Sequence, residues 1–326
     1  MTECSAPSAL IFDIYRGTTH DGPGMRTTLF FKGCPLSCKW CHNPEGISFE
    51  NGITYTKGKC MGCGLCGLQA GREIVRVQNG EPVLAAPLKE IPPVCVDNCP
   101  SGALAMEARA YSVDELFVEA VRDRAFFESF GGGVTVSGGE PTASNKFVLS
   151  LLKKLRESDI HTALDTSGYV PWPVLESLLP YTDLVLYDIK VADNERHLAL
   201  TGVENQLIID NLFRLISYKK RIGNGLSIWV RTPLIPNDTA TEENISTIGS
   251  LLNLHGGEQI DRWELCSFNN TCASKYQRLG LPWHYSGTAL MTDIEAEDML
   301  TAAAKSFDKE KTKRSGFTRK PDGEST

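Results

Sequence analysis

The sequence predicts an α/β protein built on a partial (β/α)6 barrel that carries one insertion. From residue 111 onward, short apolar and β-branched runs alternate with amphipathic runs of helical period, which is typical of a parallel sheet covered by helices. Polar motifs directly follow several of these strands, at the edge where barrel enzymes carry their sites. Residues 49–110 differ, because they are rich in cysteine and show little periodicity.

The individual elements follow in chain order. A helix over 111–130 is expected to begin with Ser112 as its cap and Glu115 as the capping-box partner. Strands are predicted at 10–15, 27–32, 134–137, 161–165, 184–189, 226–232 and 262–266, and further helices at 145–158, 206–220 and 241–254. Counting from the strand at 27–32 gives six β/α units, and six units rather than eight imply a barrel that does not close.

The same patterns predict four segments. Residues 1–48 form the N-terminal part of the barrel with a cysteine loop, and residues 49–110 form the insertion. Residues 111–304 complete the barrel. Residues 305–326 are charged and contain scattered Gly and Pro, so we expect a flexible tail.

Composition narrows the class of protein. The chain has 326 residues, a net charge of −7 and 11 cysteines. The acidic balance argues against nucleic acid as the main partner, and no apolar run reaches the ~20 residues that span a bilayer. Without a segment resembling a signal peptide we expect reducing cytoplasm, where so many cysteines indicate metal or redox chemistry rather than disulfides. The expected oligomeric state is a monomer.

Three cysteines stand close together after the second predicted strand. Cys34, Cys38 and Cys41 have C-x3-C-x2-C spacing. A [4Fe–4S] cube normally takes four thiolates, so a run of three leaves one iron open, as catalytic metal sites do. A zinc site is the alternative, but no fourth ligand follows at zinc spacing and His42 directly abuts Cys41.

This run resembles the radical S-adenosylmethionine (SAM) signature. The flanking sequences Asp21-Gly22-Pro23-Gly24-Met25-Arg26 and Cys41-His42-Asn43-Pro44 narrow the resemblance to the activating enzymes of glycyl radical enzymes, the family of pyruvate formate-lyase activase. The resemblance implies an oxidoreductase of anaerobic metabolism that cleaves SAM reductively to a 5′-deoxyadenosyl radical. That radical removes hydrogen from a glycine of a partner glycyl radical enzyme. Flavodoxin or ferredoxin is the implied electron donor.

Further motifs resemble this family in the expected order. The resemblance implies that the cluster is held by Cys34, Cys38 and Cys41. It also implies that SAM or an associated monovalent cation is bound by Gly138, Gly139, Glu140, Asp165, Thr166, Asp188, Lys190, Arg231 and Asn269. Lys190 is further expected to take part in catalysis. Glu140 is expected to accept a hydrogen bond from the ammonium group of SAM. Asn269 stands where pyruvate formate-lyase activase has a histidine, so this position cannot titrate here. A simple turn at Gly138–Gly139 and a surface ion pair for Arg231 are the alternatives.

The insertion resembles a bacterial ferredoxin module. Cys60, Cys63 and Cys66 are followed by Cys99-Pro100, and in two-cluster ferredoxins the fourth cysteine of each run ligates the other cluster. By that rule Cys60, Cys63, Cys66 and Cys99 hold a second [4Fe–4S] cluster. Cys95 then lacks the partner cysteines that a further cluster would need, so we expect no third cluster. Zinc could take the same four thiolates.

Two other functions stay open at this point. A radical SAM enzyme that acts on a small molecule would share the fold and the cysteines. A ferredoxin-like electron carrier without catalysis would not need a site with three ligands. Cleavage of SAM without a partner separates the electron carrier from the other two.

Overall fold

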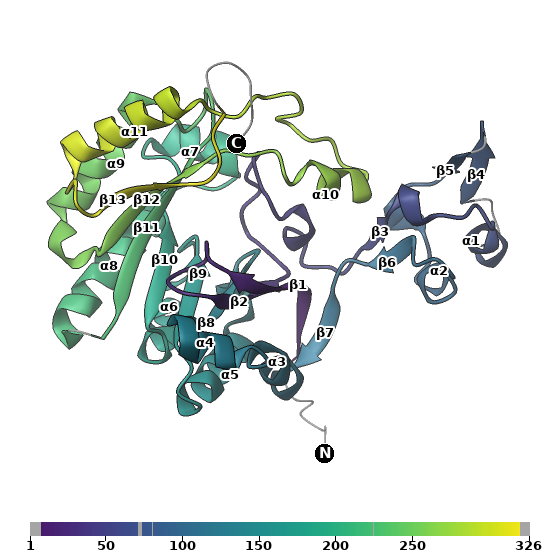
Figure 1. Cartoon of the computed structure of the whole chain (residues 1–326), viewed down its shortest axis with the longest axis horizontal. Helices are drawn as coiled ribbons and strands as arrows, with labels where there is room; N and C mark the ends of the chain where they lie inside the picture. Colours follow the sequence, from purple (N-terminus) through teal and green to yellow (C-terminus); the bar gives the residue numbers. More distant parts are fainter. Residues whose placement is uncertain (1–7, 71–73, 80, 224, 320–326) are drawn as a thin grey trace.

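The computed structural model describes residues 8–70, 74–79, 81–223 and 225–319. Its centre is a nine-stranded sheet in the order β13-β12-β11-β10-β9-β8-β2-β1-β7 (Figure 1). The strands are β1 (Ser8–Thr18), β2 (Arg26–Phe31), β7 (Arg109–Ser112), β8 (Gly133–Gly138), β9 (Thr162–Thr166), β10 (Leu184–Asp188), β11 (Ser227–Leu234), β12 (Arg262–Ser267) and β13 (Thr312–Ser315). Strands β2 and β8 to β13 run parallel, whereas β1 and β7 pair antiparallel at one edge.

Helices cover the outer face of the parallel strands. They are α3 (Val113–Ala120), α4 (Arg124–Phe130), α5 (Asn145–Glu157), α6 (Trp172–Leu178), α8 (Gln206–Ile222), α9 (Glu242–Leu254) and α11 (Asp293–Ser306). Two further helices, α7 (Asn194–Thr201) and α10 (Ala273–Arg278), lie beside the cysteine loop and form hydrogen bonds with it. Short 3-10 helices lie at Pro44–Gly46, Pro141–Ser144, Leu179–Tyr181 and Gly257–Gln259. The main core forms where these helices meet the sheet, with fully buried residues such as Leu151 and Leu212. The predicted alternation of strands and helices is thus confirmed.

One predicted helix is divided. Residues 109–112 form strand β7, and a break after Ala120 separates α3 from α4. Ser112 and Glu115 make the predicted capping box at the start of α3. The helix starts later than predicted because Arg109–Ser112 pairs with β1 and so extends the sheet.

The expected flexible tail is wrong for its described part. Helix α11 continues to Ser306, and Thr312–Ser315 forms β13, which pairs in parallel with β12. Backbone hydrogen bonds to a buried strand outweigh the polar composition of this segment. Residues 320–326 of that prediction lie outside the described residues.

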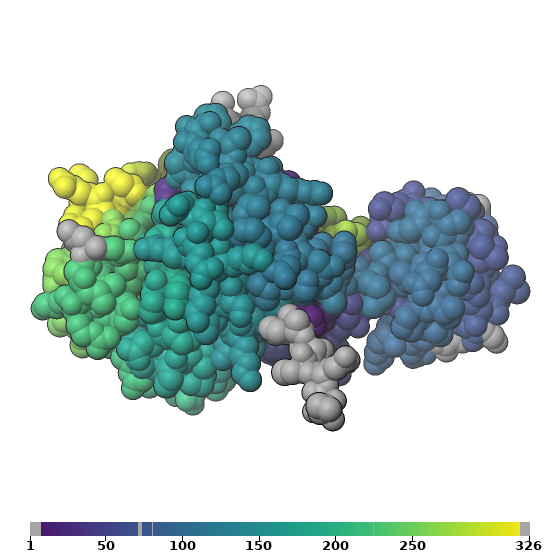
Figure 2. Space-filling view, turned by 90° about the horizontal axis from the view of Figure 1, so that it is seen from below, coloured from purple at the N-terminus to yellow at the C-terminus, as the bar shows by residue number. Residues whose placement is uncertain are grey.

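The insertion forms a lobe of its own beside the barrel (Figures 1 and 2). It contains two small antiparallel sheets, β3 (Ile53–Tyr55) with β6 (Leu104–Met106) and β4 (Val75–Gln78) with β5 (Glu81–Leu84). Its helices are α1 (Leu65–Gln69) and α2 (Val94–Asp97), with 3-10 turns at Lys57–Lys59 and Leu88–Glu90. A small core around Ile74, Ile91 and Cys95 holds these elements together.

A buried ion pair joins the insertion to the barrel. The Lys32 side chain, at the end of β2, is fully buried and pairs with Glu107 at the base of the insertion. Its Nζ also donates to the carbonyl oxygen of Glu45 at 2.6 Å. A buried ammonium group needs such partners, so this contact fixes the insertion next to the cysteine loop. Among the described residues, none of the helices is both long and apolar enough to cross a membrane.

Candidate active site

A cavity of about 440 Å³ lies at the carboxyl ends of the parallel strands. The residues predicted for the SAM site line it with one exception: Cys34, Cys38, Cys41, Gly138, Gly139, Asp165, Thr166, Asp188, Lys190, Arg231 and Asn269 all contribute. The exception is Glu140. Parallel strands end at one edge of the sheet, so motifs far apart in the sequence meet there.

The cysteine loop is held in place mainly by its backbone. Cys34 N–H donates to Ile47 O at 3.0 Å, and Ser37 N–H donates to Thr201 O at 2.8 Å. On the other side, the Tyr276 hydroxyl donates to Cys41 O at 2.9 Å. These bonds hold all three thiols at the cavity wall without using the sulfur atoms.

The three thiols are half-buried and lie near other acidic groups. Burial, followed by the nearby Glu140 carboxylate, raises the pKa of Cys34, and burial raises the pKa of Cys38. Burial also raises the pKa of Cys41 to about 12. Metal binding requires thiolates and therefore releases protons. Iron at this loop would supply the positive charge that stabilises them.

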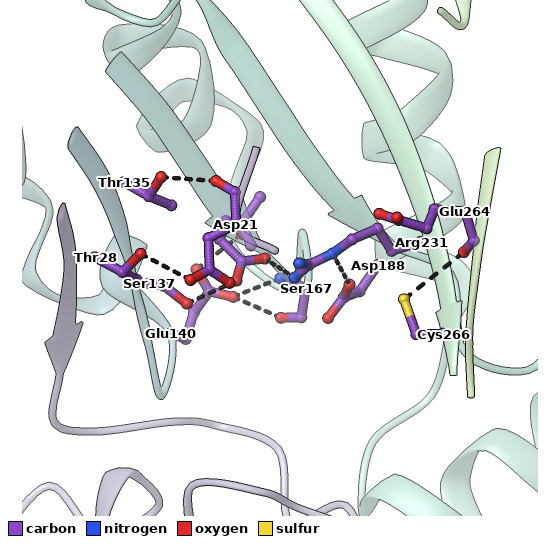
Figure 3. A network of polar contacts seen from close by, with 12 residues as sticks. Asp21, Thr28, Thr135, Ser137, Glu140, Ser167, Asp188, Arg231, Glu264 and Cys266 are labelled. Carbon is purple, nitrogen blue, oxygen red and sulfur yellow. Dashed lines mark hydrogen bonds and ion pairs between the residues drawn. The ribbon is translucent and has the colours of Figure 1, made fainter. Parts of the chain in front are cut away.

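Four charged side chains form a network on the neighbouring strand ends, and Figure 3 shows two of them, Asp188 and Arg231. Arg231, on β11, pairs with Asp165 on β9 and, through Nε at 3.4 Å, with Asp188 on β10. Lys190 Nζ lies 2.6 Å from the second oxygen of Asp188. The alternative of a surface ion pair for Arg231 is wrong, because its side chain is only 15% exposed.

Burial and pairing act on these groups in opposite directions. Burial raises the pKa of Asp165 to about 6, although Arg231 acts to lower it. Burial would also raise the pKa of Asp188, but Lys190 and Arg231 hold it below its ordinary value. The pKa of Lys190 is raised, because Asp188 and Cys38 outweigh the effect of burial. The network therefore keeps two cations beside the cysteines at neutral pH.

The structure gives Glu140 a different place from the expected one. Its carboxylate is buried and accepts hydrogen bonds from five protein donors, which belong to Thr142, Thr166 and Ser167. A carboxylate offers about four lone-pair positions, so no capacity is left for the ammonium group of SAM. Glu140 instead ties the Gly138–Gly139 turn to the end of β9.

Gly138 and Gly139 allow a close approach of two backbone segments. Gly138 has φ +116°, and a Cβ built there would lie 2.3 Å from the backbone nitrogen of Phe31. A Cβ on Gly139 would lie 2.4 Å from Gly46 O. The turn thus packs directly on the ends of the cysteine loop, which shows that it is more than an unconstrained turn.

Sequence reasoning missed several residues that line the cavity. Asp21 lies here, and its carboxylate accepts hydrogen bonds from Thr18 and Thr28 hydroxyls at 2.7 and 2.8 Å (Figure 3). The flanking motif contains Asp21, so its signal was present but unused. Ser267, Cys266 and the segment Ser315–Phe317 also line the cavity. Cys266 and Ser267 lie on β12, whereas the position of Ser315–Phe317 depends on β13, which the composition of the C-terminal segment concealed.

Four cysteines of the insertion line a second, small cavity. Its volume is about 20 Å³, and Cys60, Cys63, Cys66 and Cys99 contribute to its wall. Cys95 is absent from that wall, is buried, and donates from Sγ to Cys66 O at 3.4 Å. No three His, Cys, Asp or Glu side chains among the described residues are arranged to hold a single metal ion.

Comparison with known proteins identifies the family of this chain. The model of the radical SAM superfamily matches residues 28–247. The (2S)-3-sulfopropanediol dehydratase activating enzyme of Klebsiella oxytoca is 40% identical over 85% of this chain and 87% of its own length. The isethionate sulfite-lyase activating enzyme of Oleidesulfovibrio alaskensis is 39% identical over 75% and 79%.

A third relative is the 4-hydroxyphenylacetate decarboxylase activating enzyme of Clostridium scatologenes, which is 35% identical over 89% of this chain and 92% of its own length. All three similarities extend over three quarters or more of both chains. The chain therefore belongs to the radical SAM superfamily and, within it, to the activating enzymes of glycyl radical enzymes.

Proposed function

We propose that this chain activates a partner glycyl radical enzyme at the cavity described above. The carrying observation is that one cavity brings the three cysteines together with the paired charges of Asp165, Asp188, Lys190 and Arg231. When bound, the [4Fe–4S] cluster supplies the electron that cleaves the sulfonium bond of SAM and so generates the 5′-deoxyadenosyl radical. The radical takes hydrogen from one glycine of the partner.

The side chains around the cysteines match the charges of SAM. Arg231 and Lys190 are buried cations that can bind its carboxylate or ribose hydroxyls. The carboxylates of Asp165 and Asp188, with the hydroxyl of Thr166, are oxygen ligands of the kind that suits a monovalent cation. Gly138, Gly139 and Asn269 complete the wall. A cavity that excludes water protects a radical from side reactions.

In the insertion, we assign one further [4Fe–4S] cluster to Cys60, Cys63, Cys66 and Cys99. The four line one cavity, as a cube with four thiolates requires. The Tyr55 hydroxyl oxygen at that cavity is buried and lacks a hydrogen-bond partner among the described residues, so it could donate to a thiolate or to sulfide. Cys95 stays outside the cluster.

The partner class follows from the relatives. Their names associate them with a dehydratase, a sulfite-lyase and a decarboxylase, and we propose a partner of this kind. We further propose a monomer that works in reducing cytoplasm, where its thiols persist. Reduced flavodoxin or ferredoxin would supply the electron.

Anaerobic incubation with SAM and dithionite tests the proposal. Partner-free formation of methionine and 5′-deoxyadenosine is expected, followed by a glycyl radical doublet in electron paramagnetic resonance when a partner is added. Partner-free cleavage without a doublet for any dehydratase, lyase or decarboxylase offered would favour a small-molecule substrate. No cleavage by protein with a full iron load would overturn the assignment of the site.

A further inference from the structure

The segment that follows β13 runs along the mouth of the cavity. Strand β13 pairs with β12 so that Ser315 lies opposite Cys266. Ser315, Gly316 and Phe317 then contribute to the cavity wall. The described end of the chain therefore forms one side of the entrance.

Gly316 turns the chain at this point. Its φ is +91°, in the left-handed region, and a Cβ there would lie 3.0 Å from the carbonyl oxygen of Ser267. Residues other than glycine rarely adopt this conformation. The turn lays the segment against Ser267 and carries Phe317 to the mouth.

Phe317 is held between two anchors. On its N-terminal side, Arg314 lies 3.4 Å from Asp293, at the start of α11. On its C-terminal side, the Thr318 hydroxyl donates to the same carboxylate at 2.6 Å, and Arg319 N–H donates to Met291 O at 2.9 Å. The backbone is therefore held on both sides of Phe317.

The ring itself is exposed. Phe317 is 57% exposed although it lines a cavity whose wall carries several charged groups. Next to it, the Ser267 hydroxyl is buried and has no hydrogen-bond partner within the described part of the chain. An exposed aromatic ring on a segment held by hydrogen bonds, together with a hydroxyl group that has no partner, is typical of a binding surface.

We propose that Phe317 is a specificity-determining residue that contacts the glycine-bearing loop of the partner enzyme. This inference rests on the proposed function. SAM is matched by the charged groups on the strand ends, whereas the partner's glycine has to enter past the mouth. An aromatic ring there offers apolar area to the loop at a small cost in conformational entropy.

The test compares Phe317→Ala with Phe130→Ala. Phe130 is 59% exposed and lies at the end of α4, next to the amino end of β8, whereas the cavity lies at the carboxyl ends of the parallel strands. Full-length protein loaded with iron and sulfide is assayed for partner-free 5′-deoxyadenosine and for glycyl radical. The probes are sulfopropanediol dehydratase, isethionate sulfite-lyase and 4-hydroxyphenylacetate decarboxylase, and the most strongly activated one is used.

Phe317→Ala should lower the rate of radical formation at limiting partner about fivefold or more, as an anchor residue does. The loss of radical formation should be several times larger than any loss of partner-free cleavage, Phe317→Tyr should restore activation, and Phe130→Ala should change neither readout. Equal activation by both alanine variants, or equal losses of both readouts in Phe317→Ala, would overturn the inference. If wild type cleaves SAM but activates no probe, the proposed partner class fails, and this inference fails with it.

Discussion

The two cysteine sets lie in surroundings of opposite kind. Cys34, Cys38 and Cys41 line a cavity of about 440 Å³ together with paired carboxylates and buried cations. Cys60, Cys63, Cys66 and Cys99 line one of about 20 Å³, and no charged side chain of the described residues shares its wall. The first cavity has room for a charged small molecule beside a cluster, whereas the second is much smaller. The proposed ligand sets differ in the same way, with three thiolates in the wide site (Cys34, Cys38 and Cys41) and four in the closed site (Cys60, Cys63, Cys66 and Cys99). An open iron favours catalysis at the wide site, and a fully ligated cluster favours storage or relay of electrons at the closed site.

The largest expected effect concerns the wide site. Cys38→Ala removes one of three cluster ligands, so partner-free 5′-deoxyadenosine formation should fall by about three orders of magnitude or more. Cys272→Ala is the matched control, because that thiol is buried but lies outside both cavities. If Cys38→Ala still cleaved SAM at the wild-type rate, the assignment of this loop as the cluster-binding site would be wrong.

In the closed site, a ligand change should affect iron content more than cleavage. Wild type should hold about eight irons per chain, as two cubes require. Cys63→Ala should lower this to about four and leave dithionite-driven, partner-free cleavage of SAM measurable. About twelve irons in wild type, or four irons with one zinc, would contradict the proposed second cluster.

The charged network gives the wide site a stability signature that the closed site lacks. Arg231→Met leaves the buried carboxylates of Asp165 and Asp188 without their shared partner. Breaking a buried ion pair in this way costs about 3–5 kcal/mol. Thermal unfolding of the SAM-free protein should show this loss as a lower midpoint. Arg221→Met is the control, because the Arg221 side chain is 67% exposed in its pair with Glu176, and it should shift the midpoint little. Similar midpoints for both variants would mean that the network does not stabilise the fold.

Sequence reasoning succeeded where local pattern determines structure. The buried strands ending at Asp165 and Asp188 were predictable from their apolar runs, and parallel topology then brought their carboxylates together. Sequence reasoning failed where contacts between distant parts of the chain determine the structure. Nothing local shows that Glu140 is saturated by donors from another strand, or that Thr312–Ser315 joins the sheet despite its charge. Lys32 shows the same limit, since its ion pair spans 75 residues.

Glu140→Gln should distinguish a structural role of Glu140, in which it holds the Gly138–Gly139 turn against the end of β9, from a role in SAM binding. An amide nitrogen cannot accept the hydrogen bonds that Thr142 and Ser167 N–H groups now donate. Leaving one such buried group unsatisfied costs about 1–3 kcal/mol, and the loss should be visible in thermal unfolding without SAM. Glu128→Gln is the control, because that carboxylate is 65% exposed. Unchanged stability combined with weaker SAM binding would return Glu140 to its expected role.

Cys95→Ala should have the smallest effect on stability and no effect on iron content. Its Sγ makes one hydrogen bond to Cys66 O and otherwise packs in the small core, so it behaves as a buried apolar group. We expect a loss of about 1 kcal/mol in unfolding free energy and an unchanged iron content. Cys63→Ala, by contrast, is expected to lose four irons although Cys63 is exposed. A drop in iron on replacing Cys95 would show that burial did not exclude it from cluster binding, and that the ligand set of the closed site has to be redrawn.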